Sequence, residues 1–205
     1  MMHRTAGLVA VTTALLAVAG CGGANGDGSG STPERSTSGA IEATEPTVAE
    51  GTFAPYSPSA TAIAYDPKLI PSGASAHLTI AEIADTTTVT LDVRGLLPNR
   101  VYGAHLHTQP CGSTGTAAGP HYQHRPDPAL SASAPSVDQL YANPQNEVWL
   151  DVTTDSQGTG MSRSTQQWRF ITRPKSLVIH AEKTETADGK AGTAGDRLGC
   201  LSVNR

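Results

Sequence analysis

Apolar and polar residues alternate along several segments of the chain beyond residue 51. Residues 88–93 alternate Val and Leu with Thr and Asp, and residues 147–153 repeat the alternation. Because successive side chains of a strand point to opposite faces, each segment would have one apolar and one polar face. This pattern is typical of an antiparallel sheet that packs on a core with one face and meets water with the other.

Eight segments have strand character, and Gly, Pro, Asn and Asp residues separate them. They are residues 61–65, 74–82, 88–93, 101–108, 147–153, 160–171, 176–181 and 198–203. No helical periodicity is sustained and no repeat is found, so the expected fold is all-β, with two packed sheets or a barrel. Two connections are long, residues 109–146 and 182–196, and long loops in a compact β domain usually carry function.

The first 21 residues predict an export signal rather than part of the fold. A basic start precedes an apolar run over residues 6–20, which is short for a membrane-spanning helix. The run ends in Val18-Ala19-Gly20-Cys21, which resembles a bacterial lipobox. The resemblance implies cleavage before Cys21 and a lipid anchor on its sulfur, at the outer face of the cytoplasmic membrane. An ordinary secreted protein with an unpaired Cys21 is the alternative.

Residues 22–51 consist mostly of Gly, Ser, Thr, Pro, Ala and Glu and offer little apolar surface to bury. Such a composition predicts a disordered tether, followed by a single domain over residues 52–205. The chain has 18 acidic and 14 basic residues, and removing the five acids and two bases before residue 52 leaves 13 and 12. The domain is therefore nearly neutral, which argues against nucleic acid as a partner.

Candidate chemistry is concentrated in residues 103–124, which hold four of the seven histidines and one of the three cysteines. His105 and His107 are two residues apart, so in a strand both imidazoles would lie on the same face. His121 follows a glycine-rich loop, and His180 lies in a later predicted strand. Four imidazoles without a thiolate suit copper or zinc. His77, in an early strand, is interpreted as structural.

The cysteines indicate how the two ends of the domain are joined. If Cys21 carries a lipid, Cys111 and Cys200 remain, and two cysteines in an exported domain are expected to pair. The bridge would fasten the loop before His121 to the last strand, and it would hold Arg197 near a metal bound there. Without the bridge, Arg197 would be interpreted as a solvated turn residue.

Four motifs, in this order along the chain, resemble those of the copper/zinc superoxide dismutases. They are Gly95-Leu96 through Gly103-Ala104-His105-Leu106-His107, Cys111 through Ala118-Gly119-Pro120-His121-Tyr122, Leu177-Val178-Ile179-His180, and residues 192–200 with Asp196-Arg197-Leu198-Gly199-Cys200. The resemblance implies an antiparallel Greek-key barrel or sandwich. It also implies a copper site, a superoxide substrate and an arginine that guides the anion. The implied copper ligands are His105, His107, His121 and His180, and the implied arginine is Arg197.

The chain departs from this family at the zinc site. In the family, the loop after the bridging histidine supplies two more histidines and an aspartate to zinc. Here His124 is the only histidine between Tyr122 and Ile179. The aspartate that links the two metal sites in the family is replaced by Thr184. The departures predict a degenerate zinc site and a copper-only centre.

Without zinc, the outer nitrogen of His121 needs another partner to fix the orientation of its ring. The candidates are His124, Asp127, Asp138 and Glu147, and the sequence does not rank them. A residual zinc site that combines His121 and His124 with Asp127 or Asp138 is the alternative, although structural zinc prefers four ligands.

The predicted function is a copper-dependent superoxide dismutase outside the cytoplasm that forms dioxygen and hydrogen peroxide. Contact with the membrane is expected only through the lipid on Cys21. A copper-binding lipoprotein that buffers or delivers copper on the same fold is a second hypothesis. A structural sandwich with incidental histidines is a third. The sequence predicts no oligomeric state.

Overall fold

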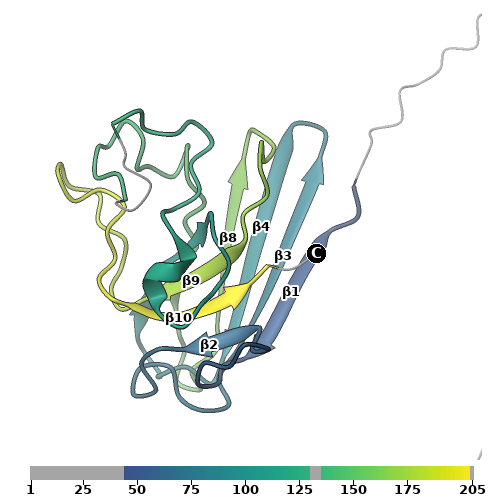
Figure 1. Cartoon of the computed structure of the whole chain (residues 1–205), viewed down its shortest axis with the longest axis vertical. Coiled ribbons are helices and arrows are strands. Elements are labelled where there is room, and N and C mark those ends of the chain that lie inside the picture. The colour runs from purple at the N-terminus through teal and green to yellow at the C-terminus, as the bar shows by residue number, and fades with distance from the viewer. Residues whose placement is uncertain (1–43, 130–134, 204–205) are drawn as a thin grey trace, which may run out of the picture. The chain divides into compact units, whose positions relative to one another are not determined.

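A computed structural model of the chain describes residues 44–129 and 135–203. These residues belong to one compact unit, whose regular secondary structure is β apart from one short 3₁₀ helix, η1 (Gly115–Ala118). Two four-stranded antiparallel sheets make up most of it (Figure 1). The strand order within each sheet is not sequential, as in a Greek-key sandwich. The all-β prediction is therefore confirmed. No helix among the described residues is both long and apolar enough to cross a membrane.

The first sheet has the order β1-β3-β4-β8. Its strands are β1 (Thr47–Thr52), β3 (Ser75–Ile83), β4 (Thr86–Arg94) and β8 (Gly160–Gln166). Side chains on β3 and β4 alternate between buried and more exposed positions. The alternation of apolar and polar residues predicts this arrangement, because only one face of the sheet contacts the core.

The second sheet has the order β2-β10-β9-β6, and two short strands pair separately beside it. Its strands are β2 (Ala62–Ala64), β10 (Arg197–Ser202), β9 (Ser176–His180) and β6 (Ala104–His107), and the short pair is β5 (Val101–Tyr102) with β7 (Val152–Thr153). Every residue of β6 and β9 is buried. These two strands lie side by side and carry three of the histidines of interest.

The predicted tether over residues 22–51 is wrong at its C-terminal end, because residues 47–51 belong to β1. The strand pairs with β3 along its whole length and buries Thr47 and Ala49, whereas Val48 is 50% exposed. An edge strand gains its stability from main-chain hydrogen bonds and needs few apolar side chains. Composition alone therefore did not reveal β1. The expected signal peptide, Cys21 and the tether up to residue 43 lie outside the described residues.

Two predicted strands are shorter or more broken than expected. The segment 160–171 ends as a strand at Gln166, after which Trp168 and Phe170 pack against the core from partly buried positions. The segment 147–153 forms isolated bridges at Glu147 and Trp149 before β7 begins.

The segment 101–108 divides into β5 and β6 at Gly103, whose N–H donates to the carbonyl of Glu182 at 2.7 Å. A Cβ atom on Gly103 would lie 2.5 Å from that oxygen. Only glycine allows this close approach, which holds the start of the second long connection against the histidine-bearing strand.

The two long connections contact each other. Nε2 of Gln139 in the first donates to the carbonyl of Thr186 in the second at 2.6 Å, and Gly192 packs against Ala142. Figure 1 shows both on the same side of the sheets, in teal and in yellow. The residues that follow β6 and β9 are thereby brought together over one end of the second sheet.

Candidate metal centre

Four buried histidines converge at the end of the second sheet. His105 and His107 lie on β6, and His180 is the last residue of β9. His121 comes from the first long connection and forms an isolated bridge with His107. One ring nitrogen from each histidine lies within 4.8 Å of the others. The structure thus brings together the four histidines that the sequence singled out.

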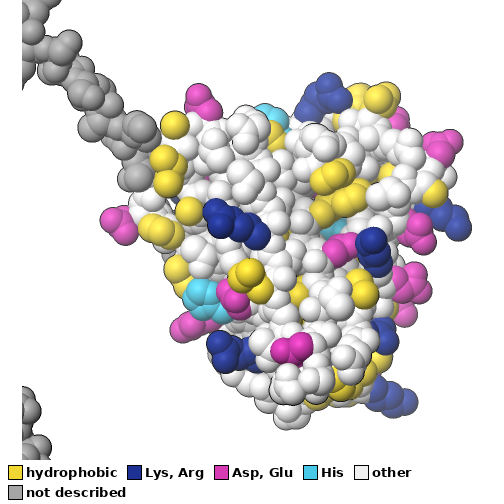
Figure 2. Space-filling view, turned by 180° about the vertical axis from the view of Figure 1, so that it is seen from behind, with side chains coloured by type: hydrophobic (Ala, Val, Ile, Leu, Met, Phe, Trp, Pro, Cys, Tyr) yellow, Lys and Arg dark blue, Asp and Glu magenta, His cyan; other side chains and the backbone are white. Residues whose placement is uncertain are grey.

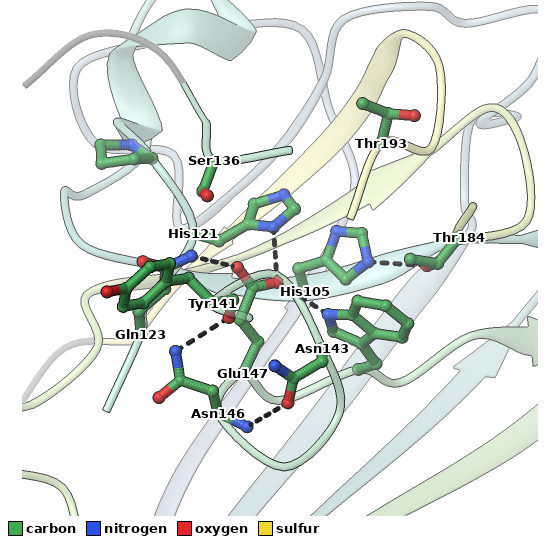
Figure 3. A network of polar contacts seen from close by, with 12 residues as sticks. His105, His121, Gln123, Ser136, Tyr141, Asn143, Asn146, Glu147, Thr184 and Thr193 are labelled. Atoms are coloured by element: carbon green, nitrogen blue, oxygen red, sulfur yellow. Dashed lines mark hydrogen bonds and ion pairs between the residues drawn. The ribbon is translucent and has the colours of Figure 1, made fainter. Parts of the chain in front are cut away.

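Thr184 fixes the ring of His105 from outside. Nε2 of His105 lies 2.7 Å from the hydroxyl of Thr184 (Figure 3), and this hydroxyl donates its own hydrogen to Asp151. The hydroxyl therefore accepts from His105, so the proton of the ring lies on Nε2 and the lone pair on Nδ1. The Thr184 N–H also donates to Asp151, at 2.9 Å, which holds the pair in place.

Backbone carbonyls fix the rings of His107 and His180. Nδ1 of His107 lies 2.9 Å from the carbonyl oxygen of Gly119, and Nδ1 of His180 lies 3.4 Å from that of Gly195. A carbonyl can only accept, so each ring is protonated on Nδ1 and carries its lone pair on Nε2.

Glu147 fixes the ring of His121, as Figure 3 shows. Nδ1 of His121 lies 2.9 Å from Oε2 of Glu147, which is 1% exposed. The same carboxylate accepts a 2.7 Å hydrogen bond from the indole of Trp149 and a 2.8 Å bond from the amide of Gln123. Of the four candidate partners for His121, Glu147 is the one in place. Three donors stabilise its buried charge.

The inward nitrogens of the cluster are left without partners. Nδ1 of His105, Nε2 of His107 and Nε2 of His180 are buried and have no hydrogen-bond partner within residues 44–129 and 135–203. Buried polar atoms are normally bonded, so a group of orphans needs an explanation. Four imidazole nitrogens that lie within 4.8 Å of one another fit a copper ion, which accepts a nitrogen donor set. The outer acceptors are the partners that metal-bound histidines normally have.

Burial keeps three rings of the cluster, those of His105, His107 and His180, neutral at ordinary pH. Burial lowers the pKa of His105 and of His107 well below the usual histidine value, and the neighbouring imidazoles lower both further. Burial also lowers the pKa of His180 to about 3. Since only a neutral imidazole can bind a metal, these three rings need to release no proton before they do so.

Cys111 and Cys200 form the predicted disulfide bond, which closes a separation of 89 residues. A loop of this length would stabilise the fold by about 4 to 5 kcal/mol in the chain-entropy model. The bond joins the loop that contains η1 to β10, which also carries Arg197.

Arg197 lies opposite His180 in the pairing of β10 with β9. Its Nη1 donates to the carbonyls of Gly115 at 3.0 Å and Gly119 at 2.8 Å, so Gly119 receives hydrogen bonds from both Arg197 and His107. Nε and Nη2 meet no acceptor in the part of the chain that the structure describes. Arg197 therefore has donors left for an anion.

A hollow of about 220 Å³ connects this arginine with the cluster. Its lining includes His121, His180, Thr193, Gly195 and Arg197. The sequence placed Arg197 near the histidines through the disulfide, and the structure has that arrangement.

The other two predicted site residues lie away from the cluster. The ring of His124 stacks on Trp168, with centroids 4.6 Å apart and 12° between the planes. Asp127 accepts hydrogen bonds from Ser136 and from the Ala129 N–H within its own loop. The described residues contain no second cluster of metal-binding side chains besides the four histidines. The residual zinc site suggested for His124 and Asp127 is therefore not assembled.

Asp127 still influences the site at a distance. Its N–H donates to Oε1 of Gln123 at 3.0 Å, and the amide nitrogen of Gln123 donates to Glu147. Asp138, the remaining candidate, is exposed and accepts from the Leu140 N–H. Neither carboxylate bonds directly to a cluster histidine.

Residues 147–151 carry outer partners of the site, namely Glu147, which was one of four unranked candidates, and Trp149 and Asp151, which the sequence analysis did not name. Glu147, Trp149 and Asp151 alternate with apolar residues, and this alternation predicted a face toward water. Instead, Glu147 bonds to the ring of His121 and accepts a hydrogen bond from Trp149, and Asp151 holds Thr184, the partner of His105. The available sequence signal was the placement of a glutamate, a tryptophan and an aspartate at every second position of one predicted strand.

Comparison with known proteins places the site in a family. A family model described as copper/zinc superoxide dismutase (SODC) matches residues 74–203. A solved structure, the Cu/Zn superoxide dismutase from Brucella abortus, is 14% identical over 80% of this chain and 100% of that chain, with a TM-score of 0.46. No curated protein matched the sequence. Because the residues that match the family model make up more than half of this chain, the chain belongs to the copper/zinc superoxide dismutase family.

Proposed function

We propose that this protein is a copper-dependent superoxide dismutase that works without zinc. The observation that carries the proposal is the set of inward imidazole nitrogens of His105, His107, His121 and His180, three of them orphaned and all four held from outside by acceptors. Bound copper would supply the redox couple that oxidises one superoxide to dioxygen and reduces a second to hydrogen peroxide. We infer superoxide as the substrate from the family. We infer a zinc-free site from the outer hydrogen-bond partners of His105 and His121.

Glu147 is the main argument against a zinc requirement. In the family, the outer nitrogen of the histidine at the position of His121 binds zinc. Here a carboxylate already occupies that nitrogen, and Gln123 and Trp149 hold the carboxylate. The Glu147 carboxylate orients the imidazole and fixes its tautomer, which is the positioning part of the role that a second metal would have.

Thr184 and Asp151 act in the same way at His105. In the family an aspartate links the two metal sites at the position of Thr184. Here the aspartate comes from residue 151 and reaches the ring through the threonine hydroxyl. Both outer anions of the centre thus lie on the segment 147–151.

Arg197 would bind superoxide beside the open side of the copper site. Arg197 lines a hollow of about 220 Å³ together with His121 and His180, and the carbonyls of Gly115 and Gly119 hold its Nη1 in place. A fixed positive charge in a small hollow attracts a small anion and orients it. This open, charged side favours turnover over the storage or delivery of copper.

Metal analysis and a superoxide decay assay on the same sample test the proposal. One tightly bound copper per chain, with decay that is fast and independent of added zinc, is the expected result. Bound copper with negligible decay would support copper buffering or delivery instead. A failure to bind copper would leave only a structural sandwich.

We also propose that the protein is anchored by a lipid on Cys21 to the outer face of the cytoplasmic membrane. The support is the lipobox-like sequence Val18–Cys21 and the disulfide bond, which is typical of oxidising compartments. Radiolabelled palmitate should enter the full chain in a bacterial host, and the Cys21→Ala variant should take up none. Equal labelling of both chains would contradict the anchor.

A further inference from the structure

Trp149 is coupled to two histidines of the cluster. The centroid of its indole lies 6.1 Å from that of the His105 ring, and the main chains of the two residues form an isolated bridge. Its Nε1 donates to Oε2 of Glu147 at 2.7 Å, and the same oxygen accepts from His121. Within residues 44–129 and 135–203, no Phe or Tyr ring pairs with a cluster histidine. Indole is the most electron-rich of the aromatic side chains, so an easily oxidised group lies beside the candidate copper site.

The surroundings of Trp149 favour the loss of an electron from its ring. The acceptor of its N–H is a carboxylate that is only 1% exposed, and a hydrogen bond to a charged group is strong where water is excluded. An indole that loses an electron becomes positively charged, and the negative charge of Glu147 beside it stabilises that state. The hydrogen bond therefore makes Trp149 easier to oxidise than an indole in water.

Trp168, the second tryptophan of the chain, is a natural comparison. Its Nε1 donates to the main-chain carbonyl of Gln145 at 2.8 Å, and its ring stacks on His124 instead of a cluster histidine. Both tryptophans are partly buried. They differ in the charge of the hydrogen-bond acceptor and in contact with the cluster.

We propose that Trp149 is a site of oxidative modification by hydrogen peroxide, and that it is oxidised in place of the four histidines of the cluster. The inference rests on the proposed function, because dismutation forms the peroxide and the bound copper would pass electrons from the indole to it. Peroxide forms beside these imidazoles at each turnover, so an oxidisable side chain in contact with them would spare the copper ligands.

The modification is the hydroxylation of the indole by one hydrogen peroxide. The O–O bond of the peroxide breaks, one oxygen atom enters a C–H bond of the ring, and the other leaves as water. The indole loses two electrons and the peroxide gains two, so the step needs no further reductant and releases no proton. The ring N–H is retained in the hydroxytryptophan, which keeps its donor to Glu147.

Exposed side chains report on oxidation that does not need copper. Hydrophobic side chains, the class that includes methionine, lie at several places on the face shown in Figure 2. Met161 on β8 is 67% exposed, and peroxide in solution converts an accessible thioether to its sulfoxide. Met161 therefore measures the exposure of each sample to peroxide.

Peroxide treatment of the copper-loaded chain, followed by peptide mass spectrometry, tests the inference. The peptide with Trp149 should gain one oxygen atom, and the peptide with Trp168 should gain none. In the metal-free chain, Met161 should be oxidised to the same extent and Trp149 should stay unmodified. Equal oxidation of the two tryptophans, or oxidation of Trp149 without copper, would overturn the inference.

A pair of variants tests whether the modification spares the histidines. Trp149→Phe keeps an aromatic ring beside His105 but removes the indole, and Trp168→Phe is the matched control. At one copper per chain, Trp149→Phe should gain oxygen on its cluster histidines and release copper faster than wild type under peroxide, whereas Trp168→Phe should behave as wild type. Equal rates of histidine oxidation in wild type and Trp149→Phe would contradict the sparing role.

Superoxide decay, measured on the same samples before peroxide is added, separates this inference from the proposed function. Fast decay by a chain in which peroxide leaves Trp149 unmodified contradicts this inference alone. A chain that binds no copper contradicts both.

Discussion

Nδ1 of His121 lies 2.9 Å from Oε2 of Glu147, and neither side chain is more than 7% exposed. Gln123 and Trp149 donate to the same carboxylate, so its orientation is fixed from three sides. The hydrogen bond makes Nε2 the only atom of the ring available to a metal. The nitrogen of His121 that points away from the cluster is thereby already bonded to a protein carboxylate.

Replacing Glu147 by Gln should weaken copper binding by about 10- to 100-fold, as is typical when the outer partner of a metal-bound histidine is lost. The amide is nearly the same size but presents a donor as well as an acceptor, so the ring of His121 loses its fixed tautomer. Competition with a copper chelator measures the affinity. Glu185→Gln, which alters an exposed carboxylate, is the control. An affinity equal to wild type in Glu147→Gln would show that the bond has no positioning role.

Replacing Thr184 by Val should lower the free energy of unfolding by about 1 to 3 kcal/mol and weaken copper binding. Valine has nearly the shape of threonine, but it leaves Nε2 of His105 without its acceptor and Asp151 without one of its donors. Chemical denaturation and chelator competition measure the two effects. Thr165→Val, on the exposed face of β8, should change neither, and the idea fails if both variants behave alike.

The metal-free protein should become less stable as the pH falls below 6.5. The pKa values of His105, His107 and His180 are lowered in the folded state, so below the ordinary value of 6.5 the unfolded chain binds protons that the folded protein does not. Each such histidine costs up to about 1.4 kcal/mol per pH unit, and for His180 this continues down to about pH 3.

Denaturation of the metal-free protein at pH 6.5, 5.8 and 5.0 measures this slope, in a range where most carboxylates remain ionised. His180→Asn should reduce it by removing one of the three groups. A free energy of unfolding that stays constant across this range would contradict the assignment.

Replacing Arg197 by Ala should slow superoxide decay about tenfold or more at low salt, because the hollow beside His121 and His180 loses its fixed charge. The rate should also depend less on ionic strength than the wild-type rate does. Arg163→Ala, on the exposed face of β8, is the charge-matched control. An undiminished rate at low salt in Arg197→Ala would remove the anion-guiding role.

Strand positions could be predicted where the residue pattern of the segment itself reveals the strand. β3 and β4 alternate polar and apolar residues because one face contacts the core, and that period is visible in the sequence. β1 was not predictable, because its stability comes from main-chain bonds to β3 rather than from its own composition. Local patterns carry no information about which strand an edge segment joins.

The four cluster histidines were predictable because they lie in ordered motifs, and the disulfide followed from the cysteine count. The outer partners were less accessible to prediction: Glu147 was one of four unranked candidates and Asp151 was not foreseen, because Glu147 is 26 residues from His121 and Asp151 is 33 residues from Thr184. Their alternation with apolar residues predicts a solvent-facing side. In the fold, the two long connections cover the polar face of residues 147–151, so this face meets the histidine cluster instead of water.

The most direct test of the account is superoxide decay by protein that has one copper per chain and from which zinc has been removed. We predict fast catalytic decay at a rate that added zinc does not change, because Glu147 already holds the outer nitrogen of His121. Decay that is negligible without zinc and restored by it would contradict a copper-only centre.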